Sequence, residues 1–383
     1  MRYLVAFDKF KDSMSAEMAC GMAQEALNSV QKESVIANAP LTDGGEGFAT
    51  ILTLCKGGML EDIEVIGPLG NPIRCRNGWV ELSELPQAVI QLLRLPKRGN
   101  LAIVEMAQSS GLEQVPREFR SPFRTTSYGT GQVLKNVAES GAAGILLGIG
   151  GSATSDCGLG ALQALGLNPG ESTLPWAPQL WDESAEWHAH MVELPPLRIA
   201  CDVNNPLLGK NGANAVYGPQ KGLTAENYPK LEALFEQIAG RLIKLFHQDT
   251  DKVEQPGSGA AGGIGFGLSC AYRDTRYIPG FKLVSEWLEL KQKVMEADCI
   301  LTGEGRFDRS SLSGKGPGML LDLARKHGKK VHVFAGKICD EAWEKASTGI
   351  FLHQIAEPGI SVEEAIAREK ELFPELIRKT FSD

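Results

Sequence analysis

The chain of 383 residues is longer than one hydrophobic core usually organises, so we expect two domains. Hydrophobic residues make up 43% and charged residues 22% of the sequence, which is ordinary for a globular protein and excludes a disordered or fibrous chain. The net charge of −8 argues against a nucleic-acid-binding protein, because such proteins normally carry a basic face or tail.

The cysteines and the apolar runs indicate where the protein works. None of the eight cysteines has a partner at the two-residue gap of a zinc or redox motif, and most lie among apolar residues, so we expect thiols in a reducing compartment. The sequence starts with a strand pattern instead of a leader peptide, and no apolar run approaches the roughly 18 residues of a membrane span. We expect a cytoplasmic monomer or homodimer with no membrane partner and no nucleic-acid partner.

The chain begins with a strand, a charged loop and a helix. Residues 2–7, which are apolar after Arg2, predict a strand that ends at Asp8, and the loop that follows carries Lys11. Ser15 is a favourable N-cap for a helix over residues 15–30. This order is typical of α/β proteins, which bind ligands where loops leave the carboxyl ends of strands.

The same order returns with an acidic loop. Residues 35–41 predict a second strand and residues 48–55 a second helix, and the loop between them contains Thr-Asp-Gly-Gly-Glu-Gly. Its acids, Asp43 and Glu46, suit Mg²⁺, which prefers one or two carboxylates with phosphate oxygens and waters. The alternative is a turn with two solvated acids, and we favour the metal because such loops recur along the chain.

The pattern then changes from strand and helix alternation to a hairpin. Residues 60–82 form short alternating segments around a Gly-Pro-Leu-Gly-Asn-Pro break, which indicates that the first domain ends near residue 70. Residues 101–106 predict another strand, and a helix is predicted over residues 127–140.

The best candidate for a phosphate-binding loop follows an apolar strand predicted over residues 144–149. Residues 150–158, which we call the glycine loop, read Gly-Gly-Ser-Ala-Thr-Ser-Asp-Cys-Gly. Residues without bulky side chains let a phosphate approach backbone N–H groups, and the positive end of the following helix would add to the attraction.

The middle of the chain offers one more strand end with polar side chains. Residues 197–201 predict a strand that delivers Asp202 and Asn204, and residues 226–246 predict an amphipathic helix. Residues 257–262 match G-x-G-x-x-G, but no strand pattern precedes them, so the dinucleotide-binding context is missing. Close backbone packing or a tight helix entrance is an equally good interpretation.

The densest group of functional side chains lies in a glycine-rich loop over residues 301–317. Residues 298–301 predict a buried strand before the loop, and residues 319–326 predict a helix after it. A solvated turn is the alternative interpretation of such a loop. Its charged residues include Glu304, Arg306, Asp308 and Lys315.

The end of the chain returns to alternating strands and helices, with a final helix capped by Ser361. We therefore predict an α/β fold of two α/β domains. One domain is discontinuous and consists of residues 1–70 and 285–383, and residues 71–284 form the inserted domain.

Together these loops hold what phosphoryl transfer needs. Backbone donors and the lysines of these loops, Lys11, Lys221 and Lys315, can bind phosphates. Carboxylates can hold Mg²⁺, and an acid can position or deprotonate the attacking hydroxyl. The sequence lacks G-x-S-x-G, H-E-x-x-H and G-x-x-x-x-G-K-[ST], which argues against a serine hydrolase, a zinc protease and a P-loop kinase. We expect a kinase of another type.

Several strings in the chain resemble the bacterial glycerate kinase family, whose members start with an Ala-Pro-Asp-Ser-Phe-Lys motif. The matches span nearly the whole chain and include long, unusual strings. They are residues 6–11, 43–47, 67–70, 125–131, 148–156, 201–203, 205–207, 218–222, 256–263 and 302–315.

The resemblance implies two α/β domains with the active site in the cleft between them. It also implies ATP-dependent, Mg²⁺-assisted phosphorylation of D-glycerate to 2-phosphoglycerate, with 3-phosphoglycerate as the alternative product. Phe7 and Lys9 replace the usual Pro and Ser of the first motif. Ser155 and Cys157 replace Asn and Gly, and Gly316 stands where a small apolar residue is usual. These departures motivate a second hypothesis, a catalytically weakened binding protein. A weaker third is an oxidoreductase that uses the G-x-G-x-x-G match.

We assign roles to residues in these strings and to Asn204, which lies between two of them. For the acid that positions or deprotonates the hydroxyl we choose Asp202 first and Asp308 second, and Lys11 and Asp8 complete the catalytic set. The glycerate ligands are Lys11, Arg306, Asn204 and Ser127. The Mg²⁺ ligands are Asp43, Glu46 and Glu304. The phosphates of ATP are bound by Gly150, Gly151, Ser152, Thr154, Asp156 and Lys315.

Overall fold

The computed structural model describes residues 1–169, 186–308, 311, 316–340, 349–357 and 359–382. The chain forms two compact units, of which unit 1 is Met1–Asp43 with Val284–Asp383 and unit 2 is Gly44–Leu283. The first boundary lies earlier than the predicted residue 70, because the hairpin predicted over residues 60–82 pairs within the sheet of unit 2.

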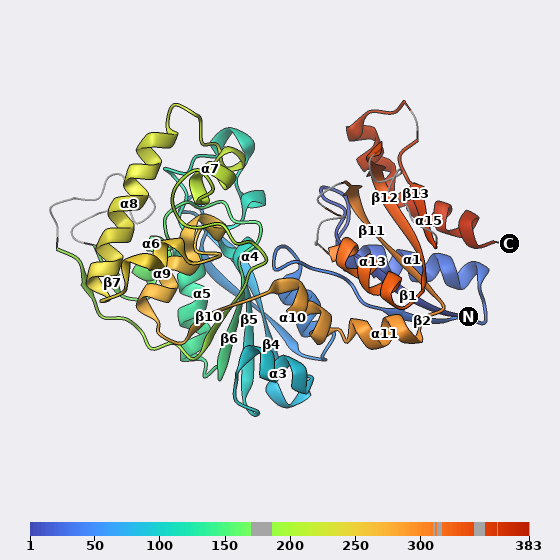
Figure 1. The fold of residues 1–383 in the computed structure, drawn as a ribbon, viewed down its shortest axis with the longest axis horizontal. Helices are drawn as coiled ribbons and strands as arrows, with labels where there is room; N and C mark the ends of the chain where they lie inside the picture. The colour runs from blue at the N-terminus through green and yellow to red at the C-terminus, as the bar shows by residue number, and fades with distance from the viewer. Residues whose placement is uncertain (170–185, 309–310, 312–315, 341–348, 358, 383) are drawn as a thin grey trace. The chain divides into compact units, whose positions relative to one another are not determined.

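The described part of unit 1 holds a five-stranded parallel sheet in the order β13-β12-β11-β1-β2 (Figure 1). Its strands are β1 (Arg2–Phe7), β2 (Val35–Asn38), β11 (Cys299–Phe307), β12 (Lys330–Ile338) and β13 (Ile350–Gln354). Its helices are α1 (Ala16–Val30), α11 (Leu290–Glu296), α13 (Gly316–Lys326) and α15 (Val362–Phe381). Because β1 pairs with both β2 and β11, the two ends of the chain build one sheet.

Helices α1 and α15 begin at the predicted caps. Ser15 accepts a hydrogen bond from the N–H of Met18 at 3.2 Å, and Ser361 accepts one from the N–H of Glu364 at 3.1 Å. Each cap satisfies one of the N–H groups that have no partner within the first turn of a helix.

An aromatic cluster forms part of the core of unit 1. The fully buried ring of Phe7 lies edge to face on Phe373 of α15, with ring centroids 5.1 Å apart. Phe10 and Phe334 pack against the same two rings. Such a ring pair contributes about 0.5–1.5 kcal/mol beyond the burial of its area. Phe7, a departure from the usual motif, is therefore a core residue.

Strand β11 is longer than predicted, so the prediction that a loop begins at residue 301 is wrong. It continues to Phe307 because β12 keeps pairing with it, with Glu304 opposite Ala335 and Arg306 opposite Lys337. A neighbouring strand supplies backbone hydrogen bonds that no local sequence pattern reveals.

The described part of unit 2 holds a six-stranded mixed sheet in the order β10-β9-β6-β5-β4-β3, parallel from β10 to β5 and antiparallel from β5 to β3. Its strands are β3 (Met59–Ile66), β4 (Pro72–Glu81), β5 (Asn100–Glu105), β6 (Gly144–Gly148), β9 (Leu197–Ala200) and β10 (Thr275–Ile278). A separate pair joins β7 (Leu167–Asn168) and β8 (His188–Ala189).

The helices of unit 2 follow its strands along the chain. They are α2 (Phe48–Leu54), α3 (Gln87–Leu93), α4 (Met106–Ser110), α5 (Tyr128–Glu139), α6 (Leu159–Ala164), α7 (Ala213–Tyr217), α8 (Tyr228–Leu245) and α9 (Ile264–Ala271). Helix α10 (Gly280–Trp287) spans the boundary between the units. Within the described ranges, every helix lacks the length and apolar character needed to span a membrane.

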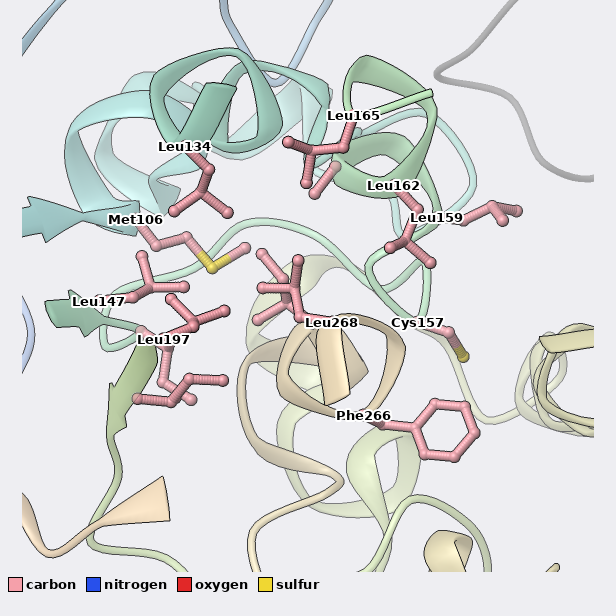
Figure 2. Close-up of a cluster of buried hydrophobic side chains, with 14 of the residues drawn as sticks. Met106, Leu134, Leu147, Cys157, Leu159, Leu162, Leu165, Leu197, Phe266 and Leu268 are labelled. Atoms are coloured by element: carbon pink, nitrogen blue, oxygen red, sulfur yellow. The ribbon is translucent and has the colours of Figure 1, made fainter. Parts of the chain in front are cut away.

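Figure 2 shows the core of unit 2, in which side chains of α5, α6 and α9 meet those of the parallel strands. Leu134, Leu147 and Leu268 are fully buried there, and burying one leucine contributes about 1.5–3 kcal/mol. Cys157 of the glycine loop lies in the same cluster, and burial raises the pKa of its thiol. Cys157 therefore packs the core beneath the loop.

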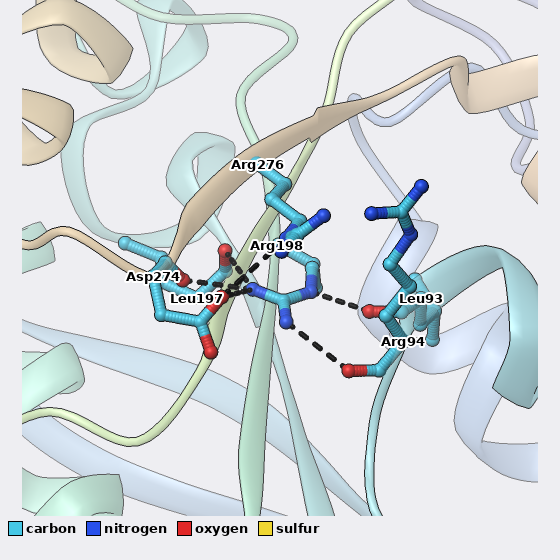
Figure 3. A network of polar contacts seen from close by, with 6 residues as sticks. All are labelled: Leu93, Arg94, Leu197, Arg198, Asp274 and Arg276. Atoms are coloured by element: carbon cyan, nitrogen blue, oxygen red, sulfur yellow. Dashed lines mark hydrogen bonds and ion pairs between the residues drawn. The ribbon is translucent and has the colours of Figure 1, made fainter.

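A buried arginine supports strand β9. The Arg198 side chain is 1% exposed, and its guanidinium donates to the carbonyl oxygens of Leu93, Arg94 and Asp274 (Figure 3). It also pairs with the Asp274 carboxylate at 3.1 Å. A buried guanidinium must find such partners, because an unpaired charge in the interior is strongly destabilising. The network fixes the strand that leads to Asp202.

Candidate active site

Three carboxylates converge at the carboxyl end of the unit 1 sheet. Asp8 follows β1, and its N–H donates to the carbonyl oxygen of Gly303 in the neighbouring strand β11 at 2.9 Å. Burial raises the pKa of Asp8 to about 7, and the nearby carboxylates of Asp43 and Glu304 add to the shift. Like charges held this close favour a proton or a cation among them.

This donor set fits a magnesium ion, which takes hard oxygen ligands and often only one or two carboxylates with waters and phosphate oxygens. Asp8, Asp43 and Glu304 offer such oxygens, whereas Glu46, the third predicted ligand, belongs to unit 2. No three His, Cys, Asp or Glu side chains in the described ranges make a metal site by themselves. An ion here would therefore depend on further oxygens from substrate and water.

The other predicted residues of unit 1 lie around the ends of β1 and β11. Lys11 is exposed in the turn after β1, and a Cβ at Gly305 would lie 3.2 Å from its backbone nitrogen. Arg306 is 71% exposed, and its Nε lies 3.4 Å from the carboxylate of Asp308. An exposed pair of this kind adds little stability, so the guanidinium can turn to a bound anion at small cost. Lys315 lies outside the described residues.

Gly316, another departure from the usual motif, has a clear steric role. A Cβ at this position would lie 2.8 Å from Oδ2 of Asp8, so any larger residue would press on that carboxylate. Glycine at the start of α13 therefore leaves room around Asp8 for a ligand.

In unit 2 the glycine loop leaves the carboxyl end of β6 and touches the acidic loop. The N–H of Gly150 donates to the carbonyl oxygen of Gly44 at 3.0 Å, and a Cβ at Gly150 would lie 2.6 Å from Cα of Gly45. Only residues without side chains permit this approach, which explains why both loops are rich in glycine.

The glycine loop is held in place but keeps donors for a ligand. The N–H of Ala153 donates to the carbonyl oxygen of Ser110 at 2.9 Å, which fixes the centre of the loop. The N–H groups of Gly151, Ser152 and Thr154, and the Thr154 hydroxyl, have no hydrogen-bond partner among the described residues. Leftover N–H groups in a tight loop are typical of anion-binding sites.

Asp156 and Ser127, which we predicted to bind ligands, are buried and bonded to each other. Oδ2 of Asp156 accepts hydrogen bonds from the N–H and the hydroxyl of Ser127, at 2.9 and 2.8 Å, and from the N–H of Gly160 at 3.2 Å. Oδ1 accepts one from the N–H of Gly158 at 3.1 Å. Burial raises the pKa of Asp156, although these donors oppose the shift. The contacts support a role in holding the glycine loop between the starts of α5 and α6.

Asp202 follows β9, which pairs with β6, so it lies at the same edge of the sheet as the glycine loop. Its carboxylate is exposed, and Oδ2 accepts a hydrogen bond from the N–H of Phe281 at the start of α10 at 2.9 Å. Asn204 is also exposed. The structure therefore leaves both predicted residues accessible to a substrate.

The predicted G-x-G-x-x-G stretch packs its backbone against the glycine loop. A Cβ at Gly262 would lie 2.0 Å from the carbonyl oxygen of Thr154, and the Gly262 carbonyl accepts a hydrogen bond from the N–H of Cys157 at 2.9 Å. A 3₁₀ helix, Thr250–Glu254, precedes the stretch instead of a strand. The interpretation as close backbone packing is confirmed.

Comparison with known proteins matches residues 3–382 to the glycerate kinase family. The chain belongs to this family. A glycerate kinase of Halalkalibacterium halodurans is 34% identical over 345 residues, which cover 88% of this chain and 85% of the relative. The glycerate 2-kinase of Escherichia coli K12 is 33% identical over 351 residues, which cover 89% of this chain and 86% of the relative.

A solved structure supports the assignment to the glycerate kinase family. A protein of Salmonella typhimurium LT2, whose crystal structure was described as that of a candidate glycerate kinase 2, is 30% identical to this chain. The two structures superpose with a TM-score of 0.75 over 100% of this chain and 97% of that protein. Glycerate kinases are phosphotransferases, so this chain is an enzyme of that class.

Two charged residues near the site of this glycerate kinase family member are buried, which the sequence did not predict. Glu105 is fully buried at the end of β5 and accepts hydrogen bonds from the N–H groups of Gly47 at 3.2 Å and Ala49 at 3.1 Å. It thus fixes the start of α2, directly after the acidic loop. Lys221 is buried against the glycine loop. The available signals were an acid ending an apolar strand and a lysine in a glycine-rich turn.

Proposed function

We propose that the protein is a glycerate kinase that transfers the γ-phosphoryl group of ATP to a hydroxyl of D-glycerate and releases ADP. The observation that carries the proposal is the family match over residues 3–382, with relatives named glycerate kinase that align with most of the chain. The local geometry supports it, because clustered carboxylates and a loop with unused N–H groups are what phosphoryl transfer requires.

The glycine loop is proposed to bind the phosphates of ATP. The N–H groups of Gly151, Ser152 and Thr154 would donate to phosphate oxygens, and Gly150 keeps the loop close to the acidic loop. Asp156 accepts hydrogen bonds from the loop and from the start of α6, so the donors are held in one arrangement before a ligand binds.

The carboxylates of unit 1 are proposed to hold Mg²⁺. Asp8, Asp43 and Glu304 would bind the ion, which neutralises charge on the phosphates when it is bound. Glu46, three residues after Asp43 in the acidic loop, stays a predicted further ligand.

Exposed residues are proposed to bind and activate the acceptor. Lys11 and Arg306 would bind the glycerate carboxylate by charge-assisted hydrogen bonds, with Asn204 as a further donor. Asp202 would position or deprotonate the attacking hydroxyl, because its carboxylate is accessible at the carboxyl end of β9. Asp308 stays the second choice, since its carboxylate lies beside the predicted substrate ligand Arg306.

We propose the 2-hydroxyl of D-glycerate as the acceptor, which would give 2-phosphoglycerate. Its support is the similarity to the Escherichia coli relative named glycerate 2-kinase. Transfer to the 3-hydroxyl would use the same loops and would give 3-phosphoglycerate.

The test is ADP production from Mg·ATP with and without D-glycerate, followed by NMR of the product. We expect ADP only when glycerate and Mg²⁺ are both present, and phosphate on the secondary hydroxyl. Phosphate on the primary hydroxyl would support the kinase activity but would make 3-phosphoglycerate the product. A folded sample that binds glycerate or nucleotide without producing ADP would favour the weakened binding protein over the kinase.

A further inference from the structure

Lys221 lies buried against the glycine loop. It ends the 3₁₀ helix Pro219–Lys221, and its side chain is 1% exposed. Its Nζ donates hydrogen bonds to the hydroxyl oxygen of Ser152 at 3.0 Å and to the carbonyl oxygen of Thr154 at 2.6 Å. The lysine therefore contacts two of the residues whose N–H groups we propose to bind phosphate.

The local backbone is built to place this side chain. Gly222, the next residue, has a φ of +87°, and a Cβ there would lie 2.1 Å from the carbonyl oxygen of Arg120. Only glycine fits such a conformation and such a close approach. The turn that carries Lys221 thus packs closely against the backbone of Arg120, which helps to hold the amine beside the glycine loop.

The donors of the amine match its two partners. A neutral lysine amine has two N–H donors, and Ser152 and Thr154 supply two acceptors, whereas the ammonium form has a third donor and a full charge. Burial lowers the pKa of Lys221 to about 7, and the Asp156 carboxylate, the charged group that faces it, opposes the shift. An anion bound in the loop would therefore decide which form is present.

We propose that Lys221 is a positioning residue that takes up a proton when the glycine loop binds a phosphate group of the nucleotide. This inference rests on the proposed function, because it assumes that the loop receives phosphates. The proton comes from solvent and stays on Nζ, and no covalent bond forms with the ligand. Ser152 accepts from Nζ through its oxygen and keeps its own hydrogen to donate to the phosphate.

The direction of the pH dependence follows from the lysine's pKa of about 7 in the free protein. Above that pH the free amine is mostly neutral, and a bound phosphate raises its pKa, so binding consumes a proton. Below it the amine is already charged and the uptake vanishes. Nucleotide affinity should therefore weaken as the pH rises above about 7.

Calorimetric titration of the full chain with Mg·ADP, in two buffers of different ionisation enthalpy, measures this uptake directly. At about pH 8 the wild type should take up roughly 0.9 proton per bound nucleotide, because a group with a pKa near 7 is then about nine-tenths neutral. Lys221→Met should take up none and should bind Mg·ADP roughly tenfold more weakly. Lys210→Met, which removes an exposed lysine from the same part of the chain, should match the wild type.

Kinetics separate this role from simple stabilisation. Lys221→Met should raise KM for ATP and leave KM for glycerate unchanged, whereas a general loss of structure would affect both substrates. Lys221→Arg, which stays charged at all pH values used, should bind Mg·ADP without proton uptake. If Lys221→Met does not fold, the wild-type titration still decides.

Binding of Mg·ADP to the wild type without proton uptake would overturn the proposal, as would unchanged uptake in Lys221→Met or no binding of Mg·ADP at all. Uptake on titration with D-glycerate alone would assign the lysine to the acceptor and overturn the proposal too. The glycerate-dependent ADP assay is independent of these results. Activity without proton uptake removes only the role of Lys221, and uptake without activity removes only the proposed reaction.

Discussion

Replacing Asp156 with alanine tests whether one buried carboxylate holds the glycine loop. The side chain is 2% exposed and accepts four hydrogen bonds, from three N–H groups and one hydroxyl. Each buried donor that loses its acceptor costs about 1–3 kcal/mol of folding free energy. Water that enters the space left by the carboxylate offsets part of this loss. We expect Asp156→Ala to lower the free energy of unfolding of unit 2 by about 3–5 kcal/mol.

Asp156→Asn should have a smaller effect, because one oxygen remains. An amide oxygen at the place of Oδ2 keeps the three donors from Ser127 and Gly160, but the amide nitrogen then faces the N–H of Gly158. This clash of donors should cost about 1–3 kcal/mol.

The expected loss of stability in Asp156→Ala corresponds to a lower melting temperature. At about 2–4 °C per kcal/mol for a unit of this size, Asp156→Ala should lower the Tm by roughly 6–20 °C.

Scanning calorimetry and urea unfolding followed by circular dichroism measure these effects. The matched control is Asp251→Ala, which removes an exposed aspartate and should change stability by less than about 0.5 kcal/mol. The reasoning is refuted if Asp156→Ala unfolds within about 1 kcal/mol of the wild type.

Three further predictions follow from the geometry. Asp202→Asn should lower kcat by roughly 10²–10⁴-fold with little change in Tm, because the amide oxygen can still accept from the start of α10; an unchanged kcat in steady-state assays would remove Asp202 from the catalytic residues. Gly303→Ala should destabilise unit 1 by more than about 3 kcal/mol in urea unfolding, since its Cβ would lie 1.7 Å from the carbonyl oxygen of Phe334; Gly21→Ala in α1, with no atom within 4 Å of its Cβ, is the control, and equal midpoints would contradict the steric argument. Burial and the neighbouring His353 lower the pKa of His332 to about 4, so the folded state binds fewer protons than the unfolded chain, and stability should fall as the pH drops from about 6.5 to about 4. Urea midpoints across that range should vary less in His332→Gln, and an identical pH dependence would count against the shift.

The sequence predicted the elements whose signals are local. Apolar runs and caps correctly indicated β1, α1 and β6, because burial periodicity and N-cap chemistry depend only on neighbouring residues. The extension of β11 to Phe307 was not predicted, because it depends on pairing with β12, which follows later in the chain. A polar, glycine-rich segment can become a strand when one neighbouring strand supplies hydrogen bonds, and the segment's own sequence does not show that neighbour.

The candidate site was predicted in part for the same reason. Asp8 follows β1 and Glu304 lies in the second half of the neighbouring parallel strand β11, so the predicted strands could be expected to bring these acids near each other, and they do lie near each other. Asp156 looked like a ligand residue because acids in glycine loops often are, yet its four donors are internal. Lys221 was expected as a loop lysine and Glu105 was given no role, but the burial of both was not predicted, since a charged residue gives no sign in the sequence that its partners will bury it.

The position of β1 also determines when unit 1 can fold during synthesis. The hydroxyl of Thr302 donates to the carbonyl oxygen of Ala6, two residues 296 positions apart, and the whole of unit 2 is translated between them. The continuous segment Gly44–Leu283 can fold while it emerges, because domains generally fold as units and the earlier ones fold first. The edge of the apolar strand β1 that pairs with β11 stays unpaired until residues 299–307 have been synthesised. During that time the nascent chain exposes an aggregation-prone strand edge that chaperones can bind.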